Sequence, residues 1–249
     1  MRILPCIVFC ALALSAFSLV ALEPTHGNLR YSKKHDRCVL DLWTIDSNRS
    51  APLVVFFHGG GFRAGDKSRF RRSGMLRRYH PKGVAFASVN YPFINHMGND
   101  YFKLMDVAAD SVKFLRAKAK KFGLDKDRIS VSGISAGALI SCHVGHGREL
   151  GISSVFPIQQ PMGTPLLTYP KLRKDGPPIL LFTYSGRNDR VHHPDNAALV
   201  RKRCEELGVA CEVYGTKQSG LPQLKEGQKP EDVAMRFFFK NWNLPFPGK

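Results

Sequence analysis

The strongest constraint on the fold is a short segment that joins an apolar run directly to a helical pattern. The run RISVSG (residues 128–133) has the composition of a buried strand, GISAG (133–137) follows it, and ALISCHV (138–144) is helical in character. A G-x-S-x-G segment between a strand and a helix forces a sharp turn that strains the serine backbone and exposes its hydroxyl at the sheet edge. The segment therefore predicts that Ser135 is a nucleophile.

Short apolar runs alternate with helical patterns along the rest of the chain. The runs are CVLDLWTI, PLVVFF, GVAFASVNY, RISVSG, PPILLFTYSG and ACEVYG, and the helical patterns lie near residues 69–79, 101–122, 134–144, 195–208 and 231–242. This alternation is typical of a mostly parallel, doubly wound α/β sheet, whose strands are buried on both faces. We expect one domain over residues 38–245, with residues 23–37 irregular and with no strand between 147 and 177.

The N-terminal segment differs from the rest of the chain. Arg2 is followed by an apolar run with no charge before Glu23, and small residues occur near its end. This pattern predicts a signal peptide over residues 1–22 and an exported protein, periplasmic or secreted. A retained membrane anchor is the alternative, because about 18 apolar residues can span a bilayer.

Cleavage of such a segment would leave four cysteines in an oxidising compartment. They are Cys38, Cys142, Cys204 and Cys211. A bridge between Cys204 and Cys211 is favoured, although the sequence alone does not define the connectivity. No paired-cysteine pattern predicts a metal site.

The glycine-rich segment HGGGF (58–62) ends an earlier predicted strand. Its backbone N–H groups can turn toward a ligand, so the amides of Gly60, Gly61 and Ala136 are candidates for an oxyanion hole. A flexible glycine turn is the alternative interpretation. We expect His58 to support the loop rather than to act as a base.

The succession of HGGGF, GDK, VNYPF, a helix at 106–110 and LDKDRISVSGISAG resembles the α/β-hydrolase esterases. It is similar to the carboxylesterase and hormone-sensitive-lipase-like group, which includes bacterial polysaccharide-associated esterases, over roughly residues 40–242. The resemblance implies a Ser, Asp, His triad in that chain order. It also implies ester hydrolysis through an acyl-enzyme, with no cofactor or metal.

The acid of that triad is predicted at Asp189. It follows the strand PPILLFTYSG and precedes Val191, similar to the order of strand, glycine, acid and valine in the family. A loop aspartate that caps the next helix is the alternative interpretation, but Asp195 is better placed for that role.

The general base is missing from its usual position. The family places a histidine after the next strand, where this chain has Gln218 and Ser219, and residues 195–249 contain none. Without a base a serine hydroxyl is a poor nucleophile. Either His192 or His193 supplies the base from the loop of the acid, or the protein is a pseudo-hydrolase that binds an ester or anion without turnover. A slow reaction without imidazole is the least favoured explanation.

Three further histidines are weaker candidates for the base. His143 and His146 lie on the helix after Ser135, and His96 lies in a loop after a strand.

The formal net charge of +17 includes basic clusters at 67–78 and 113–121. These clusters indicate either solvated helix faces or attraction to an acidic polymer or the cell envelope; nucleic acid is not an expected partner of an exported protein. In a further interpretation the basic surface itself is the function and the pocket is vestigial.

The short intervals around the motifs leave no room for a large cap. The expected site is therefore open and suits short acyl groups or acyl groups on a bulky carrier such as a polysaccharide.

Overall fold

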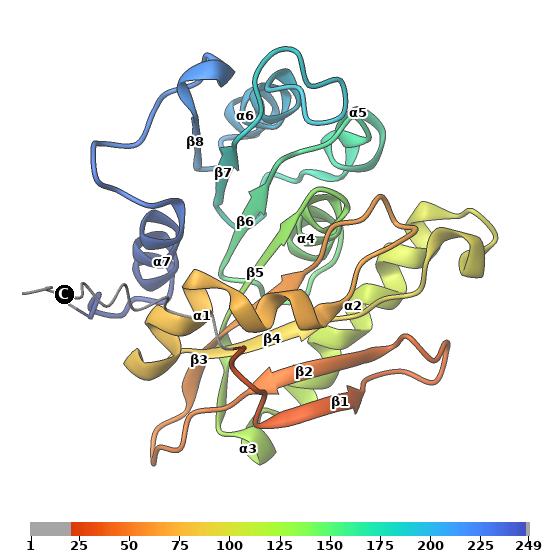
Figure 1. The fold of residues 1–249 in the computed structure, drawn as a ribbon, viewed down its shortest axis with the longest axis vertical. Coiled ribbons are helices and arrows are strands. Elements are labelled where there is room, and N and C mark those ends of the chain that lie inside the picture. Colours follow the sequence, from red (N-terminus) through yellow and green to blue (C-terminus); the bar gives the residue numbers. More distant parts are fainter. Residues whose placement is uncertain (1–20, 248–249) are drawn as a thin grey trace, which may run out of the picture.

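The computed structural model describes residues 21–247, which form one eight-stranded sheet with helices on both faces (Figure 1). The strand order is β1-β2-β4-β3-β5-β6-β7-β8; β1 and β2 are antiparallel to their neighbours, and all pairings from β4 to β8 are parallel. The strands are β1 (His26–Arg30), β2 (Val39–Trp43), β3 (Ala51–Phe57), β4 (Ala85–Val89), β5 (Leu124–Ile134), β6 (Ser154–Ile158), β7 (Ile179–Thr183) and β8 (Cys211–Gly215). The predicted mostly parallel, doubly wound sheet is confirmed.

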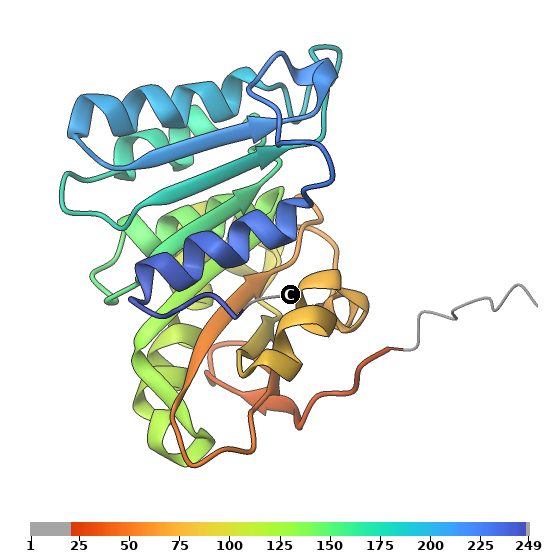
Figure 2. The same ribbon diagram turned by 90° about the vertical axis from the view of Figure 1, so that its left-hand side faces the viewer.

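The helices cover the sheet from two sides (Figures 1 and 2). One face carries the 3-10 helix η1 (Lys67–Arg72), α1 (Gly74–Tyr79) and α7 (Pro230–Asn241), and the other carries α2 (Tyr101–Ala117), α4 (Ala136–His146) and α6 (Asp195–Leu207). The remaining helices are short: α3 (Ala119–Phe122), α5 (Thr164–Leu167), η2 (His80–Lys82), η3 (Ile94–Met97), η4 (Tyr169–Lys171) and η5 (Lys217–Ser219).

Alternate side chains of the strands supply two separate apolar cores. In β3, Leu53 and Val55 pack in the core under α2 and α4, whereas Val54 packs under α1 and α7. Successive side chains of a strand point to opposite faces, so a strand covered on both sides must be apolar at nearly every position. This requirement explains the continuous apolar run PLVVFF.

Two strands lie where the sequence predicted none. β1 (His26–Arg30) falls in the segment for which the sequence predicts irregular structure, and β6 (Ser154–Ile158) lies in the interval for which it predicts no strand. β1 is a polar edge strand, so no apolar alternation marks it. β6 contains Pro157, whose missing N–H weakens any strand prediction.

Two predicted helices also differ from the structure. The segment at 69–79 is divided into η1 and α1 at Ser73, and the long helix at 101–122 is divided into α2 and α3 at Lys118. Lys67, expected on a solvated face, is buried.

The predicted signal peptide lies, except for its last two residues, outside the described residues. Leu22, at its end, is held on the fold: its N–H donates to the Arg71 carbonyl at 2.9 Å, and its carbonyl accepts from Trp43 Nε1 at 3.1 Å. Between residues 21 and 247, no helix is long and apolar enough to cross a membrane.

The connection from β6 to β7 contains only α5 and η4, and within residues 21–247 no cap domain lies over the sheet edge that carries Ser135. The four cysteines of this part of the chain are free thiols, so the favoured bridge between Cys204 and Cys211 is not formed.

Candidate active site

Ser135 stands at the turn between β5 and α4 with φ 57° and ψ −119°, a strained backbone for a residue with a side chain. The two glycines of the segment make the turn possible. A Cβ at Gly133 would lie 2.2 Å from the Gly137 carbonyl oxygen, and one at Gly137 would lie 2.0 Å from that of Phe57. Close approach of three backbone segments therefore requires glycine at both positions.

His192 approaches the serine directly. Its Nε2 lies 2.9 Å from Ser135 Oγ, and its Nδ1 lies 3.4 Å from Asp189 Oδ2. The second distance is longer than an ordinary hydrogen bond, as is common for catalytic contacts before substrate binds. The imidazole of His192 thus lies between Asp189 and Ser135, although Asp189 and His192 are only three residues apart in the sequence.

Asp189 is held by several donors. Its Oδ1 accepts the N–H groups of Val191 at 2.9 Å and His192 at 2.8 Å, and its Oδ2 accepts Ser185 Oγ at 2.6 Å. The N–H of His192 and the Ser185 hydroxyl hold the pKa of Asp189 far below its usual range. The carboxylate is therefore ionised and can orient the imidazole.

The sequence analysis missed Gln159 and Ser185, which position this acid. Gln159 Oε1 accepts Thr183 Oγ1 at 2.6 Å and the Tyr184 N–H at 2.7 Å, and Gln159 Nε2 donates to Ser185 Oγ at 2.8 Å. Gln159 follows β6 directly, so recognising that strand would have placed its amide at the sheet edge beside the acid loop.

His193 does not reach the serine. Its Nδ1 accepts the N–H of Asp195 at 3.2 Å, so it closes the turn that begins α6.

The other candidate histidines have different surroundings. His143 Nε2 lies 2.7 Å from Asp106 Oδ1 at the far end of α4, and His146 is buried there. His96 stacks on His35, with ring centroids 4.3 Å apart.

The loop after β8, where the family has its histidine, closes on itself. Ser219 Oγ donates to the Thr216 carbonyl at 2.6 Å and accepts the Leu221 N–H at 3.1 Å. Ser219 is fully buried, and a Cβ added at Gly215 would meet its hydroxyl at 2.3 Å. This serine is a structural residue of the turn.

The glycine loop lies against the nucleophile. Gly60, a predicted oxyanion residue, lines the same pocket as Ser135, and Gly61 follows it on the exposed surface. Ala136 is the first residue of α4, so its N–H has no acceptor within the helix. His58 is buried; burial lowers its pKa to about 4, and its carbonyl accepts the Tyr91 hydroxyl at 2.6 Å.

A pocket of about 430 Å³ opens beside Ser135. Its lining is mostly apolar, and its polar groups include Arg69, Ser73 and Glu231. The full lining is Phe56, His58, Gly59, Gly60, Arg69, Phe70, Ser73, Met75, Ser132, Ile134, Ser135, Phe156, Ile158, Tyr184, Pro230 and Glu231. Across residues 21–247, no cluster of three or more His, Cys, Asp or Glu side chains is arranged to hold a metal ion.

Comparison with known proteins gives partial matches in sequence. Residues 40–151 match the family model described as BD-FAE, an α/β-hydrolase esterase family. Gut esterase 1 of Caenorhabditis elegans is 32% identical over 95 residues, which are 35% of this chain and 17% of that protein. Esterase LipI of Mycobacterium tuberculosis is 28% identical over 109 residues, 43% of this chain and 33% of that protein. The chain thus spans a third or less of the curated relatives it matches.

Solved structures match over most of the chain. A truncated carbohydrate esterase from gut microbiota has a TM-score of 0.73 at 13% identity, covering 88% of this chain and 96% of that one. Propionate-bound esterase 2 of Thermogutta terrifontis has a TM-score of 0.72 at 18% identity, covering 93% and 98%. These likenesses and the sheet order identify the α/β-hydrolase fold.

Proposed function

We propose that this α/β-hydrolase, which is similar to esterases, is a serine carboxylic ester hydrolase with Ser135 as nucleophile, His192 as general base and Asp189 as the orienting acid. The observation that carries the proposal is the distance of 2.9 Å between His192 Nε2 and Ser135 Oγ. The pseudo-hydrolase interpretation rested on the lack of a histidine at the usual position near Ser219, and the contact of His192 with Ser135 supports the catalytic interpretation instead.

The reaction follows from the positions of these groups. His192 Nε2 takes the proton of Ser135 Oγ as that oxygen attacks the ester carbonyl, and Asp189 stabilises the imidazolium. The amides of the glycine loop and of Ala136 would receive the developing oxyanion. His192 then protonates the departing alkoxide, which leaves an acyl group on Ser135. In the second half, His192 takes a proton from water as the water oxygen bonds to the acyl carbon. The bond from that carbon to Ser135 Oγ then breaks, His192 returns the proton to Ser135 Oγ and the acid is released.

The open sheet edge and the pocket support separate binding positions for the alcohol and the acyl part of the substrate. The pocket of about 430 Å³ would take the acyl group, while the uncapped side leaves room for a bulky alcohol. A short-chain or carrier-linked ester, including one on a polysaccharide, fits this arrangement, and the likeness to a carbohydrate esterase supports it. The predicted export agrees with an extracellular polymer as carrier.

The basic surface is a separate part of the proposal, in which an acidic polymer or envelope is the partner. Several of its cations are already paired: Lys67 and Arg71 bind Asp41, and Arg78 binds Asp232 at 2.7 Å. The remaining cations would give weak, salt-sensitive attraction. Retention on an acidic polymer that survives Ser135→Ala would show that this attraction is independent of catalysis.

The test is hydrolysis of p-nitrophenyl acetate, p-nitrophenyl butyrate and an acetylated polysaccharide by the wild-type protein and by Ser135→Ala. We expect kcat to fall on the order of 10⁶-fold in the variant, because removing the nucleophile removes the unit that acts with it. Ser141→Ala is the matched control: it lies on the same helix and its hydroxyl only donates to the Ala138 carbonyl. Equal background rates for wild-type protein and Ser135→Ala on all three esters would contradict the proposal.

A further inference from the structure

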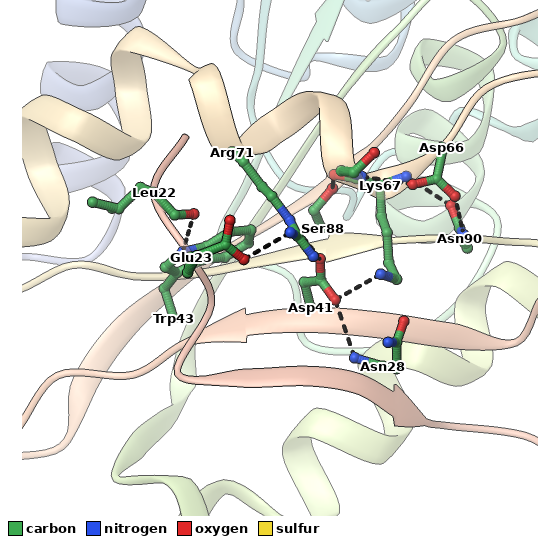
Figure 3. Close-up of polar contacts among 11 residues, drawn as sticks. Leu22, Glu23, Asn28, Asp41, Trp43, Asp66, Lys67, Arg71, Ser88 and Asn90 are labelled. Carbon is green, nitrogen blue, oxygen red and sulfur yellow. Dashed lines mark hydrogen bonds and ion pairs between the residues drawn. The ribbon is translucent and has the colours of Figure 1, made fainter. Parts of the chain in front are cut away.

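A buried carboxylate lies beneath η1, outside the groups that the proposed reaction uses (Figure 3). Asp41 of β2 has no exposed surface; its Oδ1 accepts Lys67 Nζ at 2.7 Å, and its Oδ2 accepts Arg71 Nη2 at 2.9 Å. Burial alone would raise the pKa of Asp41, but hydrogen bonds from Lys67, the Asn28 N–H and Arg71 outweigh it and lower the pKa. The carboxylate is therefore ionised between two cations.

Lys67 links this carboxylate to the backbone that follows the glycine loop. Its N–H donates to Asn90 Oδ1 at 2.7 Å, and its carbonyl accepts Ser88 Oγ at 2.9 Å. Asn90 Nδ2 donates in turn to Asp66 Oδ2 at 2.7 Å. Both Asp66 and Lys67 are thus tied to the end of β4, and the Lys67 ammonium is tied to β2.

Gly65 packs closely against the glycine loop, and the glycine loop in turn packs against the nucleophile. A Cβ at Gly65 would lie 2.3 Å from the Gly59 carbonyl oxygen and 2.4 Å from His58 Nδ1. A Cβ at Gly59 would in turn lie 3.3 Å from Ser135 Cβ. The backbone at Gly65, two residues before Lys67, is therefore packed against the loop that carries the proposed oxyanion amides.

The same carboxylate also restrains a wall of the pocket. Arg71 lies in η1 beside Phe70, and both Phe70 and Ser73 line the pocket next to Ser135. Arg71 Nη1 additionally donates to Glu23 Oε2 at 2.7 Å, which joins the start of the described chain to η1 (Figure 3).

We propose that Asp41 is a positioning residue for the hydrolysis, which fixes the oxyanion amides through Lys67 and the pocket wall through Arg71. This inference rests on the proposed function. An oxyanion hole stabilises the transition state more than the bound substrate, so its distortion lowers kcat rather than raising KM. Asp41 itself touches no reacting atom.

The experiment compares Asp41→Asn with Asp106→Asn. Asp106 is a matched control because it also pairs with basic side chains, His143 and Arg148, but at the end of α4 away from the glycine loop. The substrate is p-nitrophenyl acetate, the assay temperature lies well below the unfolding temperatures of both variants, and kcat is calculated from the concentration of titrated active sites. Under these conditions we expect kcat of Asp41→Asn to fall tenfold or more, with KM within about threefold of wild type. Asp106→Asn keeps the wild-type kcat. A kcat for Asp41→Asn within about twofold of wild type would overturn the inference.

A second variant keeps the inference testable if Asp41→Asn does not fold. Asp41→Asn combined with Lys67→Met leaves no unpaired buried ammonium, so it should fold, yet it lacks the link to the glycine loop and its kcat stays low. Restoration of kcat together with stability would overturn the inference.

Amide hydrogen exchange of residues 58–67 gives a readout that does not depend on turnover. We expect faster exchange of this segment in both Asp41 variants and an unchanged rate in Asp106→Asn. Unchanged exchange in the Asp41 variants would contradict the inference, whether or not the wild-type protein is active. An inactive wild-type protein would instead contradict the proposed function alone.

Discussion

The loops after β7 and β8 contribute unequally to the proposed catalytic groups. The loop at 184–194 carries both Asp189 and His192, whereas the loop at 216–222, where the family places its histidine, carries neither acid nor base. β7 and β8 are parallel neighbours that end side by side, with Thr183 opposite Gly215. A base on either loop can therefore reach the same point at the sheet edge. The position of a base in space therefore does not depend on its order in the chain.

Side-chain hydrogen bonds to the backbone give the two loops their opposite roles. In the first loop the carboxylate of Asp189 accepts the N–H groups of Val191 and His192, so the chain folds back over it and the imidazole is directed at Ser135. In the second loop the hydroxyl of Ser219 closes a 3-10 turn and lies inside it. The first loop directs His192 toward Ser135, whereas in the second loop Ser219 bonds only within its own turn.

The largest expected effect separates the two adjacent histidines of the first loop. His192→Ala should lower kcat on the order of 10⁵ to 10⁶-fold, because the base and the nucleophile act as a unit. His193→Ala should change kcat by less than about tenfold, since His193 only contacts the start of α6. Ester hydrolysis by both purified variants checks this expectation, and comparable losses in the two would contradict the assignment of the base to His192.

A smaller effect is expected from the acid. Asp189→Asn should lower kcat about 10³ to 10⁴-fold, because the amide no longer stabilises the imidazolium. Steady-state kinetics with the same esters measures the loss. A variant with wild-type kcat would mean that the loop holds His192 without help from the carboxylate.

Asp189 should also make the stability of the first loop depend on pH. Its folded pKa is depressed, so its contribution is present above the unfolded value of about 4 and declines as the pH falls below it. The difference in thermal midpoint between wild-type protein and Asp189→Asn should therefore be largest near neutral pH and shrink in acid. A difference that stays constant from pH 7 to pH 3 would contradict this linkage.

The smallest effect concerns the second loop. Ser219→Ala should cost about 1 kcal/mol of unfolding free energy, because it removes the hydroxyl that closes the turn, while kcat stays within about threefold of wild type. Denaturant unfolding and ester hydrolysis measure the two quantities.

Ser219→His tests whether the two loops are interchangeable. Placed in the background of His192→Ala, it should fail to restore activity, because an imidazole cannot occupy the buried position of the hydroxyl. Recovery of turnover in the double variant would show that the second loop retains room for the base of the family.

Local signals determined much of the fold and most of the candidate site. The apolar runs marked six of the eight strands, because a strand buried on both faces must be apolar at nearly every position. The strained turn at Ser135 and the glycine loop were visible because close backbone contacts require glycine at particular positions. β1 and β6 were missed because an edge strand need not be apolar and because Pro157 weakens the pattern.

The sequence by itself thus predicted the parallel sheet and the proposed nucleophile and acid, whose signals lie within a few residues of each one. It favoured His192 or His193 as the base over His96, His143 and His146, without choosing between the first two. Only the tertiary structure places His192 beside Ser135, because the direction of an imidazole depends on how Asp189 folds the loop and on where β5 delivers Ser135. It likewise buried Lys67, which belongs to a basic run in the sequence, against Asp41 from a distant strand. A pairing between distant segments leaves no periodic trace in either one.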